Sequence, residues 1–370
     1  MSPNLRAGVV GAGWRAAANR LPIMKARESR TAPAPRSDSV RSRWSRRCCA
    51  RLRTAGASRF TPGRGNQTAK GNSEVERILD CKDKLGEGVF WRPTEKALYW
   101  VDMAMPSFLH RWNPKTGEHE NWPMPEMITS LAKRHDGTLL IASHYGLNVL
   151  DQRSGILSRI AAPEASRPLN RCNDGATDAK GRFWIGTMRN NIAPDGTYLD
   201  IPESSGVLYR VEPDFRIVPM EGGIGVSNAV CWSPDNKTLY FADTMLGAIF
   251  AYDFDLTSGA IANRRVFANP EGHGYPDGAT VDSEGYVWNA RWEGGGVIRF
   301  APNGAIDRIV KAPASRVTCC AFGGDQLDTL YITTSRLHLT KQQLASPPQA
   351  GGMFALKPGA SGIPRAAFAG

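Results

Sequence analysis

Short apolar runs recur along most of this chain. Each run is rich in β-branched and aromatic residues, lies between turns rich in Gly, Asp, Asn and Pro, and is followed by a second, similar run. The six first runs are residues 97–102, 138–143, 182–187, 238–243, 286–291 and 329–334. The six second runs are residues 108–112, 147–151, 207–211, 248–253, 296–300 and 351–356. No amphipathic helical pattern separates them, so the pattern predicts β-strands throughout.

The spacing of these runs predicts the fold. Their third positions are residues 99, 140, 184, 240, 288 and 331. A strand-only repeat with a period of about 40–50 residues is typical of a β-propeller. We therefore expect an all-β, six-bladed β-propeller over residues 73–370, with residues 75–79 closing the ring beside the C-terminal blade. A β-sandwich or barrel is the alternative, which the regularity of the six units disfavours.

Residues 1–72 differ in composition from the rest of the chain. The whole chain has a formal net charge of +11, but residues 1–70 alone hold 14 Arg and 2 Lys against Glu28 and Asp38. The apolar positions of this tail show neither helical nor strand periodicity, which predicts a disordered basic leader. An organellar transit peptide, a nucleic-acid-binding arm and a misassigned start codon stay open as alternatives. Because few aromatic residues interrupt the basic ones, we expect no nucleic-acid partner.

The remaining composition excludes several classes of protein. No apolar run reaches the length of about 18 residues that a membrane-spanning helix needs, so we expect no membrane association. Seven cysteines without a Cys-X-X-Cys pair disfavour zinc-finger and thioredoxin-like functions and predict reduced thiols. Cys319 and Cys320 are expected to be buried as small apolar residues. We expect a cytoplasmic monomer or small homo-oligomer, with organellar targeting by the leader as the alternative.

Four polar residues occupy equivalent positions in units one, three, four and five. They are Glu87, Asn173, Asn228 and Asp277, and each precedes the third position of its first run by nearly the same interval. In a propeller this position belongs to the innermost strand, so the four side chains would converge on the axis. Two buried carboxylates repel each other unless a cation lies between them, and an all-oxygen set suits Ca²⁺, Mg²⁺ or Mn²⁺. The alternative is that Asn-Asp-Gly and Pro-Asp-Gly are simple turns.

Several motifs around these positions occur in a characteristic order between about residue 75 and the C-terminus. They are Leu85-Gly86-Glu87-Gly88, Arg171-Cys172-Asn173-Asp174-Gly175, Gly186-Thr187-Met188, Ser227-Asn228-Ala229, Pro276-Asp277-Gly278 and Cys319-Cys320-Ala321-Phe322-Gly323-Gly324. As a set they resemble the gluconolactonase/regucalcin (senescence marker protein) family of sugar lactonases. The resemblance implies a six-bladed propeller that hydrolyses an aldonolactone with one catalytic divalent metal ion. It leaves Ca²⁺, Zn²⁺, Mg²⁺, Mn²⁺ and Fe²⁺ open as that ion.

The resemblance also implies roles for individual residues. Glu87, Asn228 and Asp277 match the metal ligands of the family, and Asn173 lies at or beside them. Arg171 and Asn173 match positions that hold the sugar lactone.

Three positions depart from the family pattern. Val89 stands where the family usually has Pro, and Ala229 stands where it usually has Gly. Asn191 takes the place of an acidic residue that often binds substrate hydroxyls. An amide still donates and accepts hydrogen bonds, so Asn191 bears on which sugar lactone is bound rather than on the reaction.

The implied reaction needs no covalent nucleophile. Lactone hydrolysis requires a polarised carbonyl and an activated water, and Asp277 is the expected proton acceptor for that water. The chain contains no Gly-X-Ser-X-Gly motif. Two alternatives stay open: another metal-dependent esterase or phosphotriesterase on the same propeller, and a non-enzymatic propeller that binds calcium or a protein partner.

Four ring-bearing residues are further candidates for the channel mouth. His144 and His273 are expected at the mouth or in surface loops. Tyr275 and Trp292 are expected either to stack on a sugar or to pack between blades.

Overall fold

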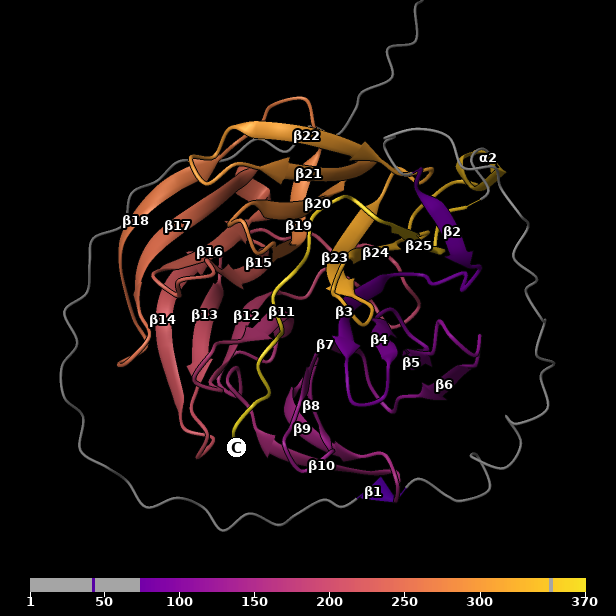
Figure 1. Ribbon diagram of the computed structural model, residues 1–370. Coiled ribbons are helices and arrows are strands. Elements are labelled where there is room, and N and C mark those ends of the chain that lie inside the picture. The colour runs from indigo at the N-terminus through magenta and orange to yellow at the C-terminus, as the bar shows by residue number, and fades with distance from the viewer. Residues whose placement is uncertain (1–41, 44–73, 346–348) are drawn as a thin grey trace, which may run out of the picture. The chain divides into compact units, whose positions relative to one another are not determined.

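The chain forms six antiparallel β-sheets arranged as blades around a central axis (Figure 1). The computed structural model describes residues 42–43, 74–345 and 349–370. The innermost strands of successive blades lie side by side in a closed ring, in the order β3, β7, β11, β15, β19 and β23. The six-bladed all-β propeller is confirmed, and the sandwich and barrel alternatives are excluded. The expected leader lies outside the described residues except for residues 42–43, and the domain boundary at residue 73 stays a prediction.

Each blade runs from an innermost to an outermost strand. The first three blades contain β3 (Gly86–Arg92), β4 (Ala97–Asp102), β5 (Phe108–Trp112), β6 (His119–Pro123); β7 (Ile128–Lys133), β8 (Leu139–Ser143), β9 (Gly146–Asp151), β10 (Ile156–Ala161); and β11 (Asn170–Thr177), β12 (Phe183–Arg189), β13 (Gly206–Val211), β14 (Ile217–Ile224). The next two contain β15 (Ser227–Trp232), β16 (Thr238–Asp243), β17 (Ala248–Asp255), β18 (Ala260–Ala268); and β19 (Tyr275–Val281), β20 (Val287–Trp292), β21 (Gly296–Phe300), β22 (Ile306–Lys311). The sixth contains β23 (Val317–Gly323), β24 (Thr329–Thr334), β25 (Met353–Leu356) and β2 (Glu76–Leu79).

Three further short elements complete the described structure. The very short strand β1 (Ser42–Arg43) pairs with the outer edge of β10. A single 3-10 turn, η1 (Thr244–Leu246), follows β16, and the short helix α2 (Lys341–Ala345) lies between β24 and β25. No helix in the described ranges is long and apolar enough to cross a membrane.

The sixth blade combines strands from both ends of the propeller sequence. Its outermost strand, β2, pairs with β25, so that Glu76 lies opposite Ala355 and Arg77 opposite Phe354. This confirms the closing strand expected at residues 75–79. Because β25 is covered by β2, the ring closes without leaving an unpaired edge inside the last blade.

The repeat predicted from the sequence coincides with the second strand of each blade. Residues 97–102, 238–243 and 329–334 form β4, β16 and β24 without any shift, and the other three runs differ from the strands only at their ends. The third positions of all six runs are between 0% and 5% exposed. These side chains form the cores between blades, which is why the repeat is visible in the sequence.

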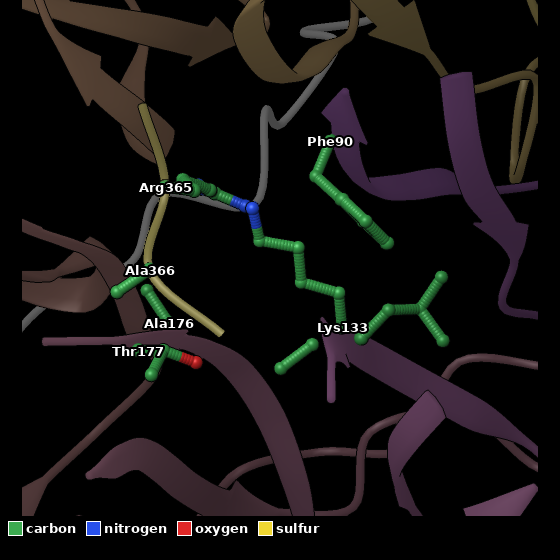
Figure 2. A pocket seen from close by; sticks show the side chains of 8 residues that line it. Phe90, Lys133, Ala176, Thr177, Arg365 and Ala366 are labelled. Carbon is green, nitrogen blue, oxygen red and sulfur yellow. The ribbon is translucent and has the colours of Figure 1, made fainter. Parts of the chain in front are cut away.

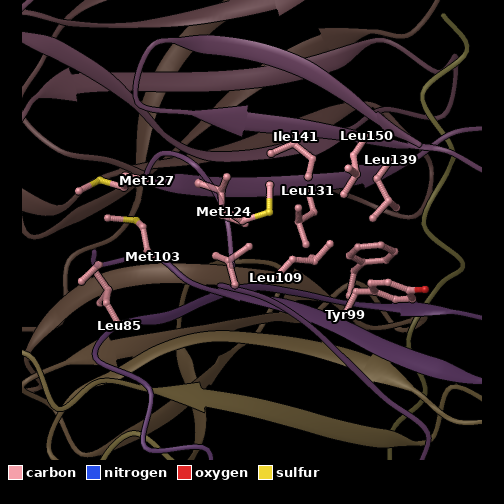
Figure 3. Packing of buried hydrophobic residues seen from close by; sticks show 14 of the residues in the cluster. Leu85, Tyr99, Met103, Leu109, Met124, Met127, Leu131, Leu139, Ile141 and Leu150 are labelled. Carbon is pink, nitrogen blue, oxygen red and sulfur yellow. The ribbon is translucent and has the colours of Figure 1, made fainter. Parts of the chain in front are cut away.

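Apolar side chains fill the space between neighbouring blades. Figure 3 shows the layer between the first and second blades, where Tyr99 and Leu109 pack with Leu131, Ile141 and other aliphatic residues. Burial of each such side chain contributes about 1.5–3 kcal/mol to folding. This packing fixes each innermost strand relative to its neighbours. It therefore also fixes the positions of the side chains that these strands direct towards the axis.

Each innermost strand contains a β-bulge. The register with the second strand shifts between Glu87 and Phe90, Ile128 and Ser130, Cys172 and Gly175, Asn228 and Cys231, Pro276 and Ala279, and Val317 and Cys319. A bulge bends a strand and redirects the side chains beside it. All four polar residues singled out in the sequence lie at these irregular positions.

The C-terminal segment, residues 357–370, crosses the propeller. In Figure 1 this yellow segment passes over the centre of the ring. It forms backbone hydrogen bonds with Leu327 at one side, through Gly362, and with Lys133 and Gly181 at the other, through Phe368 and Ala369. The segment therefore ties the last blades to the second and third.

Candidate active site

The site is built from the first halves of four innermost strands. β3 supplies Glu87, β11 supplies Arg171 and Asn173, β15 supplies Asn228, and β19 supplies Asp277. Arg171, Asn228 and Asp277 are 2%, 5% and 6% exposed, and Glu87 and Asn173 are partly buried. The structure thus gathers residues from four separate blades at one end of the channel.

A chain of side-chain hydrogen bonds links three blades across this end of the channel. The Asn173 amide nitrogen donates to Asn228 Oδ1 at 3.0 Å and to the Ser227 carbonyl at 2.8 Å. The Asn228 amide nitrogen donates to Thr244 Oγ1 at 2.8 Å, and Thr244 Oγ1 donates to the Pro276 carbonyl at 2.7 Å. The chain ends at the residue before Asp277, so it couples the positions of Asn173, Asn228 and Asp277.

Arg171 is a buried cation that joins this chain to Asn191. It donates to Asn173 Oδ1 at 2.5 Å and to Asn191 Oδ1 at 2.7 Å, and its Nε–H has no partner among the described residues. Burial lowers the pKa of Arg171 to about 10, against the opposing effect of Glu87 and Asp277. Arg171 therefore stays charged at neutral pH and keeps a free donor.

The two predicted carboxylates interact electrostatically. Burial raises the pKa of Glu87 well above its usual value, and the charges of Asp277 and Asp174 raise it further. Burial and then the charge of Asp174 raise the pKa of Asp277 in the same way. Three carboxyl groups therefore share a poorly solvated region, which is a costly arrangement unless protons or a cation compensate the charge.

These residues fit a divalent cation. Glu87, Asp277 and the amide oxygens of Asn173 and Asn228 offer only oxygen ligands, the kind that hard divalent ions prefer. Each amide oxygen already accepts one hydrogen bond, from Arg171 or from Asn173, and would bind a metal with its second lone pair. No group of three or more His, Cys, Asp or Glu side chains in the described part of the chain is arranged to hold a metal. A metal ion here would therefore depend on the Asn oxygens together with two carboxylates.

The sequence reasoning missed two residues of this site. Asp174 follows Asn173 in the same sequence motif, and its charge acts on both Glu87 and Asp277. Its carboxylate accepts backbone hydrogen bonds from Gly175 at 2.8 Å and Val230 at 3.3 Å. Its place beside Asn173 at a bulge was the available signal. Thr244 lies in a turn after β16, and no sequence pattern marks it.

The other candidates from the sequence lie in different surroundings. His144 is half-buried, and burial and the Arg171 charge lower its pKa, which locates it close to the site. The backbone carbonyl of His273 accepts a hydrogen bond from Arg291. Trp292 packs partly against a blade core, and the guanidinium of Arg316 lies 4.8 Å from its ring centroid. Of the two roles expected for Trp292, these contacts therefore favour packing between blades over stacking on a sugar.

The paired cysteines are structural, as expected. Cys319 and Cys320 are 2% and 0% exposed. Burial raises the pKa of both thiols, which keeps them protonated and unreactive at neutral pH.

The fold and this end of the channel define a class of protein: a six-bladed propeller with an oxygen-lined, charged axial site. Residues 85–336 match the family model described as the SMP-30/Gluconolactonase/LRE-like region. The chain therefore belongs to this family.

Characterised relatives of the chain include named lactonases. It is 36% identical over 264 residues to pentonolactonase XacC of Haloferax volcanii, covering 70% of this chain and 85% of that protein. It is 34% identical over 301 residues to 6-deoxy-6-sulfogluconolactonase of Pseudomonas putida, covering 81% and 100%. A solved structure described as a calcium-binding protein, regucalcin, from Agrobacterium tumefaciens superimposes with a TM-score of 0.74 at 29% identity, covering 80% of this chain and 97% of that one.

Proposed function

We propose that this protein hydrolyses a sugar lactone, an aldonolactone, with the aid of one divalent metal ion. The observation that carries the proposal is the buried Arg171–Asn173–Asn228 hydrogen-bonded chain beside the electrostatically coupled carboxylates of Glu87 and Asp277. This combination offers charged and amide donors to a polyol next to a proton acceptor. The named activities of the pentonolactonase and sulfogluconolactonase relatives support the same reaction.

The metal site of the proposal consists of Glu87, Asn228 and Asp277, with Asn173 at or beside it. When bound, a divalent ion supplies Lewis-acid polarisation of the lactone carbonyl and compensates the carboxylate charges. The calcium-binding description of the Agrobacterium relative supports a divalent ion. Ca²⁺, Zn²⁺, Mg²⁺, Mn²⁺ and Fe²⁺ are the candidates.

The chain's own residues carry the remaining chemistry. Asp277 accepts a proton from the attacking water as the water oxygen bonds to the carbonyl carbon. The ring C–O bond then breaks, and the ring oxygen leaves as a hydroxyl after it receives that proton. Arg171 helps to fix the polyol and attracts the carboxylate product through its positive charge. Its bonds to Asn173 and Asn191 orient it for this task.

Asn191 bears on which sugar is accepted. Its Oδ1 accepts a hydrogen bond from Arg171, which leaves the amide N–H₂ to act as a donor to substrate hydroxyls, where the family often has an acceptor carboxylate. We therefore expect a substrate preference that differs from that of relatives with an acidic residue here. Pentono- and hexonolactones are the substrates to compare.

Calcium binding without catalysis is the second candidate, because a solved relative is described as a calcium-binding protein. Another esterase or phosphotriesterase on the same propeller is less well supported. Such an enzyme favours an apolar pocket, whereas Arg171, Asn173 and Asn191 make this channel mouth polar and charged.

One assay separates these functions. Acid release is followed in a pH-stat with gluconolactone, xylonolactone and arabinonolactone, using the full chain loaded with each candidate metal and then treated with a chelator. We expect at least one lactone to open faster than its spontaneous rate and this excess to disappear with the metal. Calcium binding by calorimetry with no lactone opened would support the second candidate and overturn the first.

A further inference from the structure

A small cavity lies at the channel end opposite to the candidate active site (Figure 2). Strand β11 runs between the two ends, since Arg171 and Asn173 lie in its first half and Thr177 is its last residue. The cavity is lined by Phe90, Leu131, Lys133, Ala176, Thr177 and Arg365, together with two further alanines. None of these residues belongs to the candidate active site.

Two cationic side chains converge on this cavity. Lys133 is the last residue of β7, whereas Arg365 comes from the C-terminal segment, and Figure 2 shows their side chains directed towards each other. Neither side chain has a hydrogen-bond or ion-pair partner within the described ranges. Burial and the charges of Arg92 and Arg365 lower the pKa of Lys133. Two like charges thus meet with no carboxylate in the lining between them.

The cavity also contains an unsatisfied hydroxyl group. Thr177 is 9% exposed, and its Oγ1 has no hydrogen-bond partner among the described residues. Figure 2 shows this oxygen on the side of Thr177 that faces the cavity. A buried hydroxyl without a partner costs about 1–3 kcal/mol, so a native site of this kind normally holds a water molecule or a ligand group that bonds to it.

Among the residues that the structure describes, no neighbouring charged side chain neutralises Lys133 and Arg365 at the cavity. The Arg92 guanidinium acts on Lys133 as a like charge, and its own donors are used by the Gly137 carbonyl, Gln152 and Glu95. Asp174 is attracted to Arg365 at longer range, but it accepts hydrogen bonds from backbone N–H groups on the axis and does not line the cavity. The local balance at the cavity is therefore positive.

From the convergence of Lys133, Arg365 and the unpartnered Thr177 hydroxyl on one cavity, we infer that this end of the propeller binds a small oxyanion. Two cationic donors and one hydroxyl donor match the several acceptor oxygens of a phosphate, sulfate or carboxylate group. The cavity itself has a volume of about 10 Å³, room for about one water molecule, so the partly exposed Lys133 and Arg365 side chains must move apart to admit one such group. A larger ligand does not fit against the apolar wall of Phe90 and Leu131. This inference does not depend on the lactonase proposal.

Binding of an anion would also connect two distant parts of the chain. Lys133 belongs to the second blade, and Arg365 precedes the point where Phe368 bonds to the Lys133 carbonyl. An anion held by both side chains would fasten the C-terminal segment to the propeller. Thermal stability is therefore a direct readout of binding.

The test uses the metal-free full chain and inorganic phosphate, with sodium chloride at equal ionic strength as the reference. We expect phosphate to raise the unfolding temperature in a saturable manner and to give a binding isotherm by calorimetry. Lys133→Met and Arg365→Gln should each weaken phosphate binding by about tenfold or more. Thr177→Val should weaken it by about fivefold. Arg216→Gln, at an exposed Arg that does not line the cavity, should leave it unchanged.

Two further measurements complete the test: the stability of Lys133→Met without phosphate, and the response of the chain to acetate. Without phosphate, Lys133→Met should be at least as stable as the unmodified chain because one of two converging like charges is gone, so its loss of response is not a loss of folding. Acetate identifies the ligand chemistry: a response to both anions indicates recognition of small oxyanions in general, and a response to phosphate alone indicates a tetrahedral oxyanion. Equal stabilisation by chloride and phosphate, or an unchanged phosphate response in both charge variants, overturns the inference.

Discussion

The side-chain amide of Asn289 donates a hydrogen bond of 2.7 Å to the backbone carbonyl oxygen of Asp277. Asn289 is fully buried on β20, and its Oδ1 accepts a hydrogen bond of 2.9 Å from Arg291. Arg291 also donates to the carbonyl oxygens of His273 and Gly274, just before β19 begins. These contacts hold both sides of the bulge that presents Asp277 to the channel.

Asn289→Ala is expected to impair catalysis as well as stability. It leaves the Asp277 carbonyl and one Arg291 donor without partners, which costs about 1–3 kcal/mol for each group. Because Asp277 would lose its fixed position, we expect kcat to fall by about tenfold or more. Asn148→Ala is the matched control, since Asn148 is 2% exposed and hydrogen-bonded to Ser143 and Arg159 in another blade. Denaturant unfolding and steady-state kinetics on both variants check this; an equal fall in kcat for Asn148→Ala would contradict it.

Asp277→Asn tests the proposed base. The change keeps the side-chain volume and one oxygen but removes the ability to accept a proton, so activity should fall by about 10²-fold or more. Metal affinity should weaken because Glu87 would be the remaining charged ligand. The fold should persist, since removal of repulsion with Asp174 does not disturb packing between blades. Circular dichroism, metal titration and lactone assays measure the three effects, and Asp214→Asn, on an exposed turn, is the control. Full activity at saturating metal would remove Asp277 from the mechanism.

Gly88→Ala isolates backbone strain at the bulge next to Glu87. Gly88 has φ of 59°, and a Cβ there would lie 3.5 Å from Ser130 Cα, which is an ordinary contact. We expect a loss of about 1–2 kcal/mol in the free energy of unfolding from the left-handed conformation alone. Folding should survive because Ala229 has the same φ of 59° at the corresponding bulge of β15. Gly117→Ala, with φ of 73° and no atom within 4 Å of the added Cβ, is the control; a much larger loss for Gly88→Ala alone would point to steric conflict.

His110→Phe is expected to reduce the loss of folding stability that occurs as the pH falls below about 6.5. His110 Nδ1 lies 3.1 Å from His119 Nε2, and burial, followed by the His119 charge, lowers the pKa of His110 to about 3. The unfolded chain binds this proton near pH 6.5, so stability falls as the pH drops from about 6.5 towards 3. Phe retains the stacking on Trp100, whose ring lies 4.7 Å away, and removes the titration. Thermal melts between pH 4 and 7 check this, with exposed His135→Gln as the control; identical slopes for His110→Phe and the parent chain would contradict it.

The repeating strands were predictable because their signal is local. Tyr99 and its five counterparts are buried in every blade, so burial and sequence period coincide. The positions of Glu87, Asn173, Asn228 and Asp277 on innermost strands followed from the same spacing, and the structure brings the amides of Asn173 and Asn228 within 3.0 Å.

What the sequence did not reveal depends on pairing between distant segments. A bulge exists only relative to the register of a partner strand, so the redirection of Glu87 and Asp277 has no local signature. The role of Asn289 depends on a carbonyl that lies on the neighbouring strand. Arg365 reaches the channel through a crossing segment whose path is set by contacts with Lys133 and Gly181, which no periodicity encodes.

The pairing of β2 with β25 has a consequence for how the protein is made. β2 ends at Leu79, and its partner begins only at Met353, so a ribosome adds roughly 270 residues between them. At about 5–20 residues per second, β2 waits roughly 14–55 s after its own synthesis before a partner strand exists. A chain that stops before Met353 lacks β25, so β2 has no strand to pair with and the sixth blade cannot join the two ends of the propeller sequence.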